Sequence, residues 1–292
     1  MVATKNAIKK TVKTESQPNR RRFLIVFLFV GALLFVVLSA ILSIGVYAVL
    51  VADENWSEDD FWSEDCNVLV LPLRGYLSTY RPAGFSDEDW DIASAEELTE
   101  AIADAQETRF KAVLLSIDSS GGDPVAGQEV ANALRASGLP SVAVIRGLGA
   151  SAAYWAATGA DRLYASRVSE VGGIGVTASY LDESDKNKQE GYAYTELTSA
   201  KYKDLGDPGR PLSADERKLI LADLEKMHRV FIEEVALNRG LALEVAEELA
   251  NGLTYLGEDA LASGLIDELG GAPEALQYLE TRLGEPVRGC RN

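Results

Sequence analysis

Histidine is almost absent from this chain of 292 residues, which contains His228 and no other. Structural metal sites combine several histidine or cysteine ligands, and a Ser-His-Asp triad would have to use His228 as its base. The surrounding sequence LEKMHRVFIEEV favours an ordinary position on a helix face. The sequence therefore predicts neither a metal site nor a histidine-dependent triad.

Positive charge is also scarce, with 28 Lys and Arg against 45 Asp and Glu and a formal net charge of −17. A chain this acidic repels phosphate groups, which argues against nucleic-acid binding. The glycine-rich loops offer no nucleotide site either. GGIG lacks the lysine of a phosphate-binding loop, and no GxGxxG motif opens a helix after a strand.

One segment lacks charge for thirty residues, FLIVFLFVGALLFVVLSAILSIGVYAVLVA at 23–52. About 20 apolar residues cross a bilayer, so this segment predicts a transmembrane anchor. Residues 1–22 carry seven Lys and Arg against one Glu, and the positive-inside rule assigns this basic tail to the cytoplasm. We expect a single-pass protein of the cell membrane with residues 53–292 on the extracytoplasmic side. A removable export signal, suggested by RRRFL (20–24) and VYA (46–48), is the alternative that the long apolar run disfavours.

Beyond the membrane, the expected organisation is an acidic linker at 53–66, a folded domain at 67–283 and a C-terminal tail at 284–292. Cys66 and Cys290 are the only cysteines and stand near the two ends of this part. Outside the cytoplasm, a disulfide bond between them would tie these ends together, and two free thiols are the alternative.

Apolar strand-like runs alternate with helical patterns through the domain. Strands are expected at 67–73, 112–118, 141–146 and 162–165. Helices are expected after a capping box at Ser94 and Glu97, at 124–137, 151–160 and 243–250, after a second capping box at Ser213 and Glu216 (213–238), and from Pro273. The predicted fold class is α/β, a parallel sheet with βα repeats preceded by one N-terminal transmembrane helix.

A lone serine, Ser151, follows the run SVAVIR and opens the small-residue stretch SAAYWAATGA. A serine hydroxyl needs a base within hydrogen-bond reach, and with His228 unsuited a lysine is the candidate. A lysine base must be neutral, which requires burial to bring its pKa from about 10.4 toward 7–8. Lys203, among small and turn-forming residues, is the predicted base, with Lys201 two residues away. Taken alone, such a serine is more often a helix N-cap and such a lysine a surface residue.

Acyl transfer also needs hydrogen-bond donors for the oxyanion. The segment DSSGGD (118–123) follows a strand and precedes a helix, so Gly121 and Gly122 can expose their backbone N–H groups. The N–H of Ala152, at the start of the next helix, is a further candidate donor. The alternative for the SSGG segment is an ordinary turn.

The succession DSSGGD, GASAAY, GGIGV, KYKDLGDPGRPLSADER and TYLGEDALASGLIDELGG resembles the signal peptide peptidase A family. These are Ser-Lys peptidases of the Clp protease–crotonase superfamily, and the resemblance runs from about Asn67 to Gly271. Where the family has a proline this chain has Ser120, and where it has two glycines this chain has Ala152 and Ala153. If those two positions are helical, alanine is the better residue.

The resemblance implies a role for each candidate residue. Ser151 matches the nucleophile, Lys203 the general base, and Gly121 with Gly122 the oxyanion loop, so that 67–283 would be a Ser-Lys peptidase domain. The short, single-repeat members of the family assemble into rings in which the lysine of one protomer serves the serine of its neighbour. The resemblance implies the same homo-oligomeric ring here.

The first functional hypothesis is a membrane-anchored serine endopeptidase that works without a cofactor or metal ion. It would cleave apolar or extended peptides, such as residual signal peptides, on the extracytoplasmic side. The second is a catalytically inactive or chaperone-like membrane assembly that retains the fold. Acyl-CoA chemistry on the crotonase version of the fold is disfavoured, because an exported acidic domain rarely meets that anion.

Overall fold

The computed structural model describes residues 66–81 and 92–291, all of which belong to one compact unit. Within these ranges no helix combines the length and the hydropathy needed to cross a bilayer. The predicted tail at 1–22, the predicted anchor at 23–52 and nearly all of the predicted linker at 53–66 lie outside the described residues.

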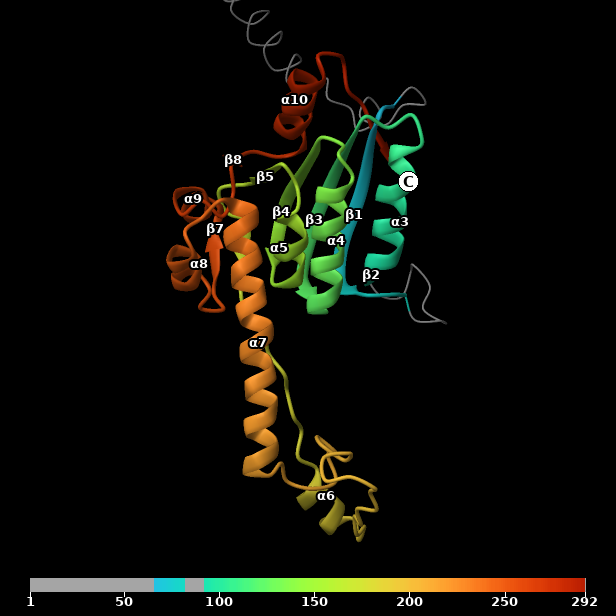
Figure 1. Ribbon diagram of the computed structural model, residues 1–292, viewed down its shortest axis with the longest axis vertical. Coiled ribbons are helices and arrows are strands. Elements are labelled where there is room, and N and C mark those ends of the chain that lie inside the picture. Colours follow the sequence, from blue (N-terminus) through green and yellow to red (C-terminus); the bar gives the residue numbers. More distant parts are fainter. Residues whose placement is uncertain (1–65, 82–91, 292) are drawn as a thin grey trace, which may run out of the picture. The chain divides into compact units, whose positions relative to one another are not determined.

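A nine-stranded sheet forms the centre of the described part of the chain (Figure 1). Its main path runs in the order β2 (Ile92–Ser94), β1 (Val68–Ser78), β3 (Ala112–Gly122), β4 (Ser141–Ala150), β5 (Arg162–Ala165) and β8 (Glu268–Leu269). Beside this path, β6 (Glu170–Gly172) pairs with β4, β7 (Thr254–Leu256) with β6, and β9 (Gly289–Arg291) with β1. All pairs are parallel except β6 with β7. The expected parallel α/β sheet is confirmed.

The described helices are α3 (Ala95–Gln106), α4 (Pro124–Ala136), α5 (Ala152–Ala157), α6 (Ser184–Gln189), α7 (Ala214–Arg239), α8 (Leu243–Leu249), α9 (Gly257–Ala262) and α10 (Ala272–Leu283). Each helix expected from the sequence is present within a few residues of its predicted start. The stretch expected to be helical over 151–160 forms the shorter α5.

Alternate residues of the central strands face opposite sides of the sheet, as the period of two along a strand requires. On β1, Leu69, Leu71 and Leu73 lie in the larger core, to which α3, α4, α5 and α7 contribute. Val68 and Val70 lie in the smaller core, where α10 packs. Because both faces are covered, these strands are apolar at nearly every position rather than at every second one.

The two predicted capping boxes differ in the structure. At α7, the Ser213 hydroxyl accepts from the Glu216 N–H, and the Glu216 carboxylate accepts from the Ser213 N–H, so the box is complete. At α3, Ser94 accepts from the Glu97 N–H at 3.3 Å. The Glu97 carboxylate instead binds the Arg81 guanidinium at 3.0 Å, which leaves this box half formed.

The C-terminal strand returns to the beginning of the domain. In β9, Cys290 lies opposite Leu69 of β1, and it forms a disulfide bond with Cys66, with the two Cα atoms 5.3 Å apart. The structure therefore contains the disulfide expected from the sequence. Residues 289–291, expected in a tail, are part of the sheet.

The longest described helix, α7, has 26 residues and is therefore about 39 Å long. Its C-terminal half packs on α5, where the rings of Phe231 and Trp155 stack with centroids 4.3 Å apart. The indole N–H of Trp155 also donates to Glu234 of α7 at 2.8 Å. The N-terminal half of α7 extends away from the sheet to the region of α6 (Figure 1).

Candidate active site

Ser151 joins β4 to α5 in a backbone conformation that side chains rarely adopt. Its φ of 52° and ψ of −127° make it the one non-glycine residue with positive φ in the described ranges. Such a conformation costs about 1–3 kcal/mol and persists only where the surrounding structure holds it. Here the Ser151 N–H donates to the Gly172 carbonyl of β6 at 2.8 Å, and the Ser151 carbonyl accepts from Trp155 N at 2.9 Å.

The hydroxyl of Ser151 does not cap α5, although the residue occupies the N-cap position. The explanation of this serine as an ordinary helix cap is therefore unsupported. A strained turn between a strand and a helix is also the setting of the serine in the nucleophile elbow. Ser151 is partly exposed, so a substrate can reach it, and acyl transfer would further require a base within hydrogen-bond reach.

Gly121, near the end of β3, lies against this turn. A Cβ atom at position 121 would stand 2.7 Å from Ser151 Cβ and 2.9 Å from Ala152 N, and the φ of Gly121 is +102°. Only glycine allows β3 to approach the turn this closely. Because Ala152 begins α5, its N–H has no partner within the helix and remains a candidate oxyanion donor.

Gly121 and Gly122, the last two residues of β3, have different surroundings. The Gly121 N–H donates to the Ser119 hydroxyl at 3.0 Å, and this hydroxyl donates to the Gly75 carbonyl at 2.6 Å. A Cβ atom at Gly122 would collide with the Leu77 carbonyl oxygen of β1 at 1.9 Å. The structure thus brings Gly121 and Ala152 to the Ser151 turn, with the Gly121 N–H already engaged by Ser119, whereas Gly122 packs against Leu77 of β1.

The small residues around Ser151 serve helix packing. A Cβ atom at Gly127 of α4 would lie 2.5 Å from the Ala152 carbonyl oxygen, so α4 and α5 are in direct backbone contact. Ala152 and Ala153 are buried and helical. The second departure from the family pattern therefore places alanine where it is well tolerated.

Lys203 lies in a series of turns before α7, and its side chain is exposed. Among the described residues its ammonium group has no hydrogen-bond or ion-pair partner. The neighbouring Lys201 is engaged: its Nζ lies 3.4 Å from Asp215 Oδ2 and 4.7 Å from the centroid of the Tyr202 ring. Tyr202, and then Asp215, raise the pKa of Lys201 above its ordinary value, the opposite direction to the one that a lysine base needs.

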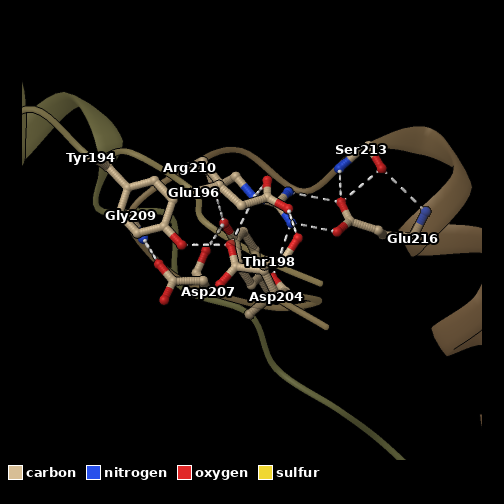
Figure 2. A network of polar contacts seen from close by, with 10 residues as sticks. Tyr194, Glu196, Thr198, Asp204, Asp207, Gly209, Arg210, Ser213 and Glu216 are labelled. Carbon is tan, nitrogen blue, oxygen red and sulfur yellow. Dashed lines mark hydrogen bonds and ion pairs between the residues drawn. The ribbon is translucent and has the colours of Figure 1, made fainter. Parts of the chain in front are cut away.

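Within one chain, Lys203 does not lie beside Ser151. The turns that carry Lys203 form part of a polar network with the first turn of α7 (Figure 2). The segment around α6 lies at the N-terminal end of that helix, away from the sheet (Figure 1). From Ala214 to Phe231, where α7 meets α5, the helix rises about 26 Å. Ser151, Gly121 and Ala152 are therefore together, and Lys203 is distant from them within the same chain.

His228 lies on α7 as expected and is half-buried, and its buried Nε2 has no hydrogen-bond partner within the described part of the chain. The described residues contain no group of histidine, cysteine and carboxylate side chains arranged to hold a metal ion. Neither observation gives His228 a part in the arrangement around Ser151.

A model of Peptidase family S49 matches residues 133–284, a range that includes Ser151 and Lys203. The putative protease MJ0651 of Methanocaldococcus jannaschii is 35% identical over 172 residues, which are 58% of this chain and 55% of that protein. The putative signal peptide peptidase SppA of Enterococcus faecium is 24% identical over 280 residues, or 90% of this chain and 81% of that protein. The chloroplastic serine protease SPPA of Arabidopsis thaliana is 29% identical over 197 residues, or 66% and 29%.

The chain thus spans about half the length of the archaeal relative and under a third of the chloroplast one. Among solved structures, two mutant forms of the 1510-N membrane-bound stomatin-specific protease align with TM-scores of 0.48 and 0.47, at 15% and 17% identity. The first alignment covers 79% of this chain and 99% of that chain, and the second covers 74% and 80%.

Proposed function

We propose that this chain, which belongs to peptidase family S49, is a serine endopeptidase with Ser151 as its nucleophile and Lys203 as its general base. The family membership bears out the resemblance to the signal peptide peptidase A family. The observation that carries the proposal is the conformation of Ser151. Its positive φ, the close approach of Gly121 and a hydroxyl that does not cap α5 support a nucleophile whose position is fixed by the fold.

In this reaction the Ser151 Oγ attacks the carbonyl carbon of the scissile peptide bond while a neutral lysine amine accepts the hydroxyl proton. The carbonyl oxygen becomes an oxyanion that accepts from the Ala152 N–H, beside the Gly121–Gly122 loop. The lysine then returns the proton to the leaving amine, and the acyl-serine ester forms. Water hydrolyses the ester by the same steps with the lysine again as base.

We assign the base to a neighbouring copy of the chain. Lys203 is exposed, and its segment is separated from Ser151 along α7, so the dyad is incomplete in one protomer. A head-to-tail ring would supply the same contact at every interface, with the lysine of each protomer beside the serine of the next. Contact with the neighbour would also remove water from the ammonium group, which favours its neutral form.

The proposed location is the extracytoplasmic face of the cell membrane, with 23–52 as the anchor. The Cys66–Cys290 disulfide supports an oxidising compartment, because such bonds are rare in the cytoplasm. The proposed substrates are apolar or extended peptides, including signal peptides left in the membrane after export. The name of the Enterococcus faecium relative supports this substrate class.

A fluorophosphonate probe, which reacts with activated serines, tests the proposal. Labelling of the intact protein should be lost in Ser151→Ala and in Lys203→Ala, and retained in Lys201→Ala, a matched lysine variant from the same segment. Peptide cleavage should follow the same pattern. A folded wild-type protein that neither reacts nor cleaves would contradict the proposal and favour the inactive assembly.

A further inference from the structure

We propose that Arg210 is a positioning residue for the base, because it joins the main chain directly after Lys203 to the first turn of α7. The inference rests on the proposed function, in which Lys203 is the general base. It adds a residue that would touch neither the peptide nor Ser151, and that would act by fixing where the lysine segment sits.

The first half of this link is the contact between Arg210 and Asp204, the residue that follows Lys203 (Figure 2). Arg210 Nη2 donates to the Asp204 carbonyl oxygen at 2.9 Å, and Nε lies 3.3 Å from Asp204 Oδ2. The same carboxylate oxygen accepts from the Tyr194 hydroxyl at 2.5 Å. Both the main chain and the side chain next to Lys203 are therefore held.

The second half is the contact between Arg210 and Glu216, in the capping box of α7. Arg210 Nη1 and Nη2 donate to the two Glu216 oxygens at 3.0 and 2.6 Å. Glu216 also accepts from the Ser213 N–H at 2.9 Å and from its hydroxyl at 2.7 Å, and its side chain is only 5% exposed. Arg210, followed by Ser213, lowers the pKa of Glu216 to about 2, so this carboxylate stays charged and fixed at the helix end.

Charge alone does not account for this arrangement. Three carboxylates of the described network, those of Glu196, Asp204 and Glu216, lie around the single guanidinium of Arg210, with Glu196 Oε2 3.5 Å from Nε. A lysine at position 210 would supply the same charge. It would lack the planar fork that reaches Asp204 and Glu216 at the same time.

Such a link matters because α7 is the rigid element between the lysine segment and the rest of the domain. Its other end packs on α5 through Phe231 and Trp155, so α7 fixes the lysine segment relative to its own domain and thereby to the neighbouring Ser151 that it would serve. Without Arg210, the turns around Lys203 would keep their local bonds but would be attached to this helix, apart from the main chain, only by the exposed Lys201–Asp215 pair. A displacement of about 1 Å in a catalytic group can cost about 10²-fold in rate.

The decisive variant is Arg210→Lys in the full-length protein, compared with Arg217→Lys, an exposed arginine of α7 one residue from Glu216. The substrate is a fluorogenic apolar peptide, assayed well below the melting temperature. Arg210→Lys is expected to lower kcat by about 10- to 100-fold and to change KM by less than about twofold, because substrate binding does not involve this residue. Arg217→Lys is expected to keep the wild-type values of both.

Amide hydrogen exchange provides a readout that does not depend on activity. In Arg210→Lys, exchange is expected to increase over residues 200–212 and to stay unchanged in α4 and α5, which also establishes that the domain is folded. A wild-type kcat, or unchanged exchange over 200–212, would overturn the inference while leaving the dyad standing. If Lys203→Ala retains cleavage, the proposed base is wrong and the inference falls with it, whatever the exchange of the Arg210 variant.

Discussion

We expect Gly121→Ala to lower both the free energy of unfolding of the domain and its rate of peptide cleavage, through two different effects. The φ of Gly121 is +102°, and an added Cβ atom would lie 2.7 Å from Ser151 Cβ, 2.8 Å from the Ala150 carbonyl oxygen and 2.9 Å from Ala152 N. The backbone strain in Gly121→Ala should lower the free energy of unfolding by about 1–3 kcal/mol. The methyl group would also crowd the Ala152 N–H, and losing one oxyanion donor costs about 10²–10³-fold in kcat.

Gly138→Ala is the matched control. Gly138 also has a positive φ, +66°, but nothing lies within 4 Å of an added Cβ atom, and the residue is exposed. This variant should lose about 1 kcal/mol of stability from the backbone alone and should cleave peptide at the wild-type rate. Urea unfolding and peptide cleavage, measured where both variants are folded, give the comparison. Equal cleavage by the two variants would refute the assignment of the Ala152 N–H as an oxyanion donor.

Three further predictions concern the lysine segment and the disulfide. Lys203→Ala is expected to abolish peptide cleavage while Lys201→Ala retains it; the reverse result would put the base at Lys201. Reducing the Cys66–Cys290 bond, which closes a separation of 224 residues, should lower the free energy of unfolding by about 2–5 kcal/mol in urea titrations, and an unchanged midpoint would argue against the bond. Because the pKa of Glu216 is lowered from 4.5 to about 2, its hydrogen bonds contribute to stability above about pH 4.5, and this contribution is lost as the pH falls toward 2. Hydrogen exchange over 200–216 should increase through that window, and Glu216→Gln should show no such increase.

The main strands and helices of the domain could be predicted because each carries a local signal. Apolar runs marked β1, β3, β4 and β5, and capping residues at Ser94 and Ser213 marked the starts of α3 and α7. The short strands β6, β8 and β9 carry no such signal, since their conformation depends on pairing with distant segments. For the same reason β4 extends beyond the predicted end at 146 to Ala150, where it pairs with β6.

The candidate site was predictable in its residue types and not in its geometry. The sequence marks Ser151 as a lone serine among small residues, but its positive φ occurs in a turn held by a hydrogen bond to Gly172, 21 positions later. Arg210 was missed, because its partners Asp204 and Glu216 meet only when the turns fold back on the start of α7. An isolated arginine three residues before a capping box was the available signal.

The separation of Lys203 from Ser151 depends on the direction in which α7 leaves the sheet. No local pattern encodes that direction. It follows from the packing of Phe231 on Trp155 and of Val235 in the larger core, which orient the C-terminal half of the helix. Periodicity predicts that such a helix exists and leaves open which of its ends lies beside the nucleophile.

The shared Ser-Lys site is tested most directly by mixing two inactive variants, Ser151→Ala and Lys203→Ala, in detergent and allowing their subunits to exchange. With equal amounts and random assembly, about one quarter of the interfaces would join an intact serine to an intact lysine. The account predicts that the mixture regains cleavage to about that fraction of the wild-type rate, although each variant alone has none. Co-assembly verified by pull-down with cleavage still at zero would contradict a dyad shared between protomers.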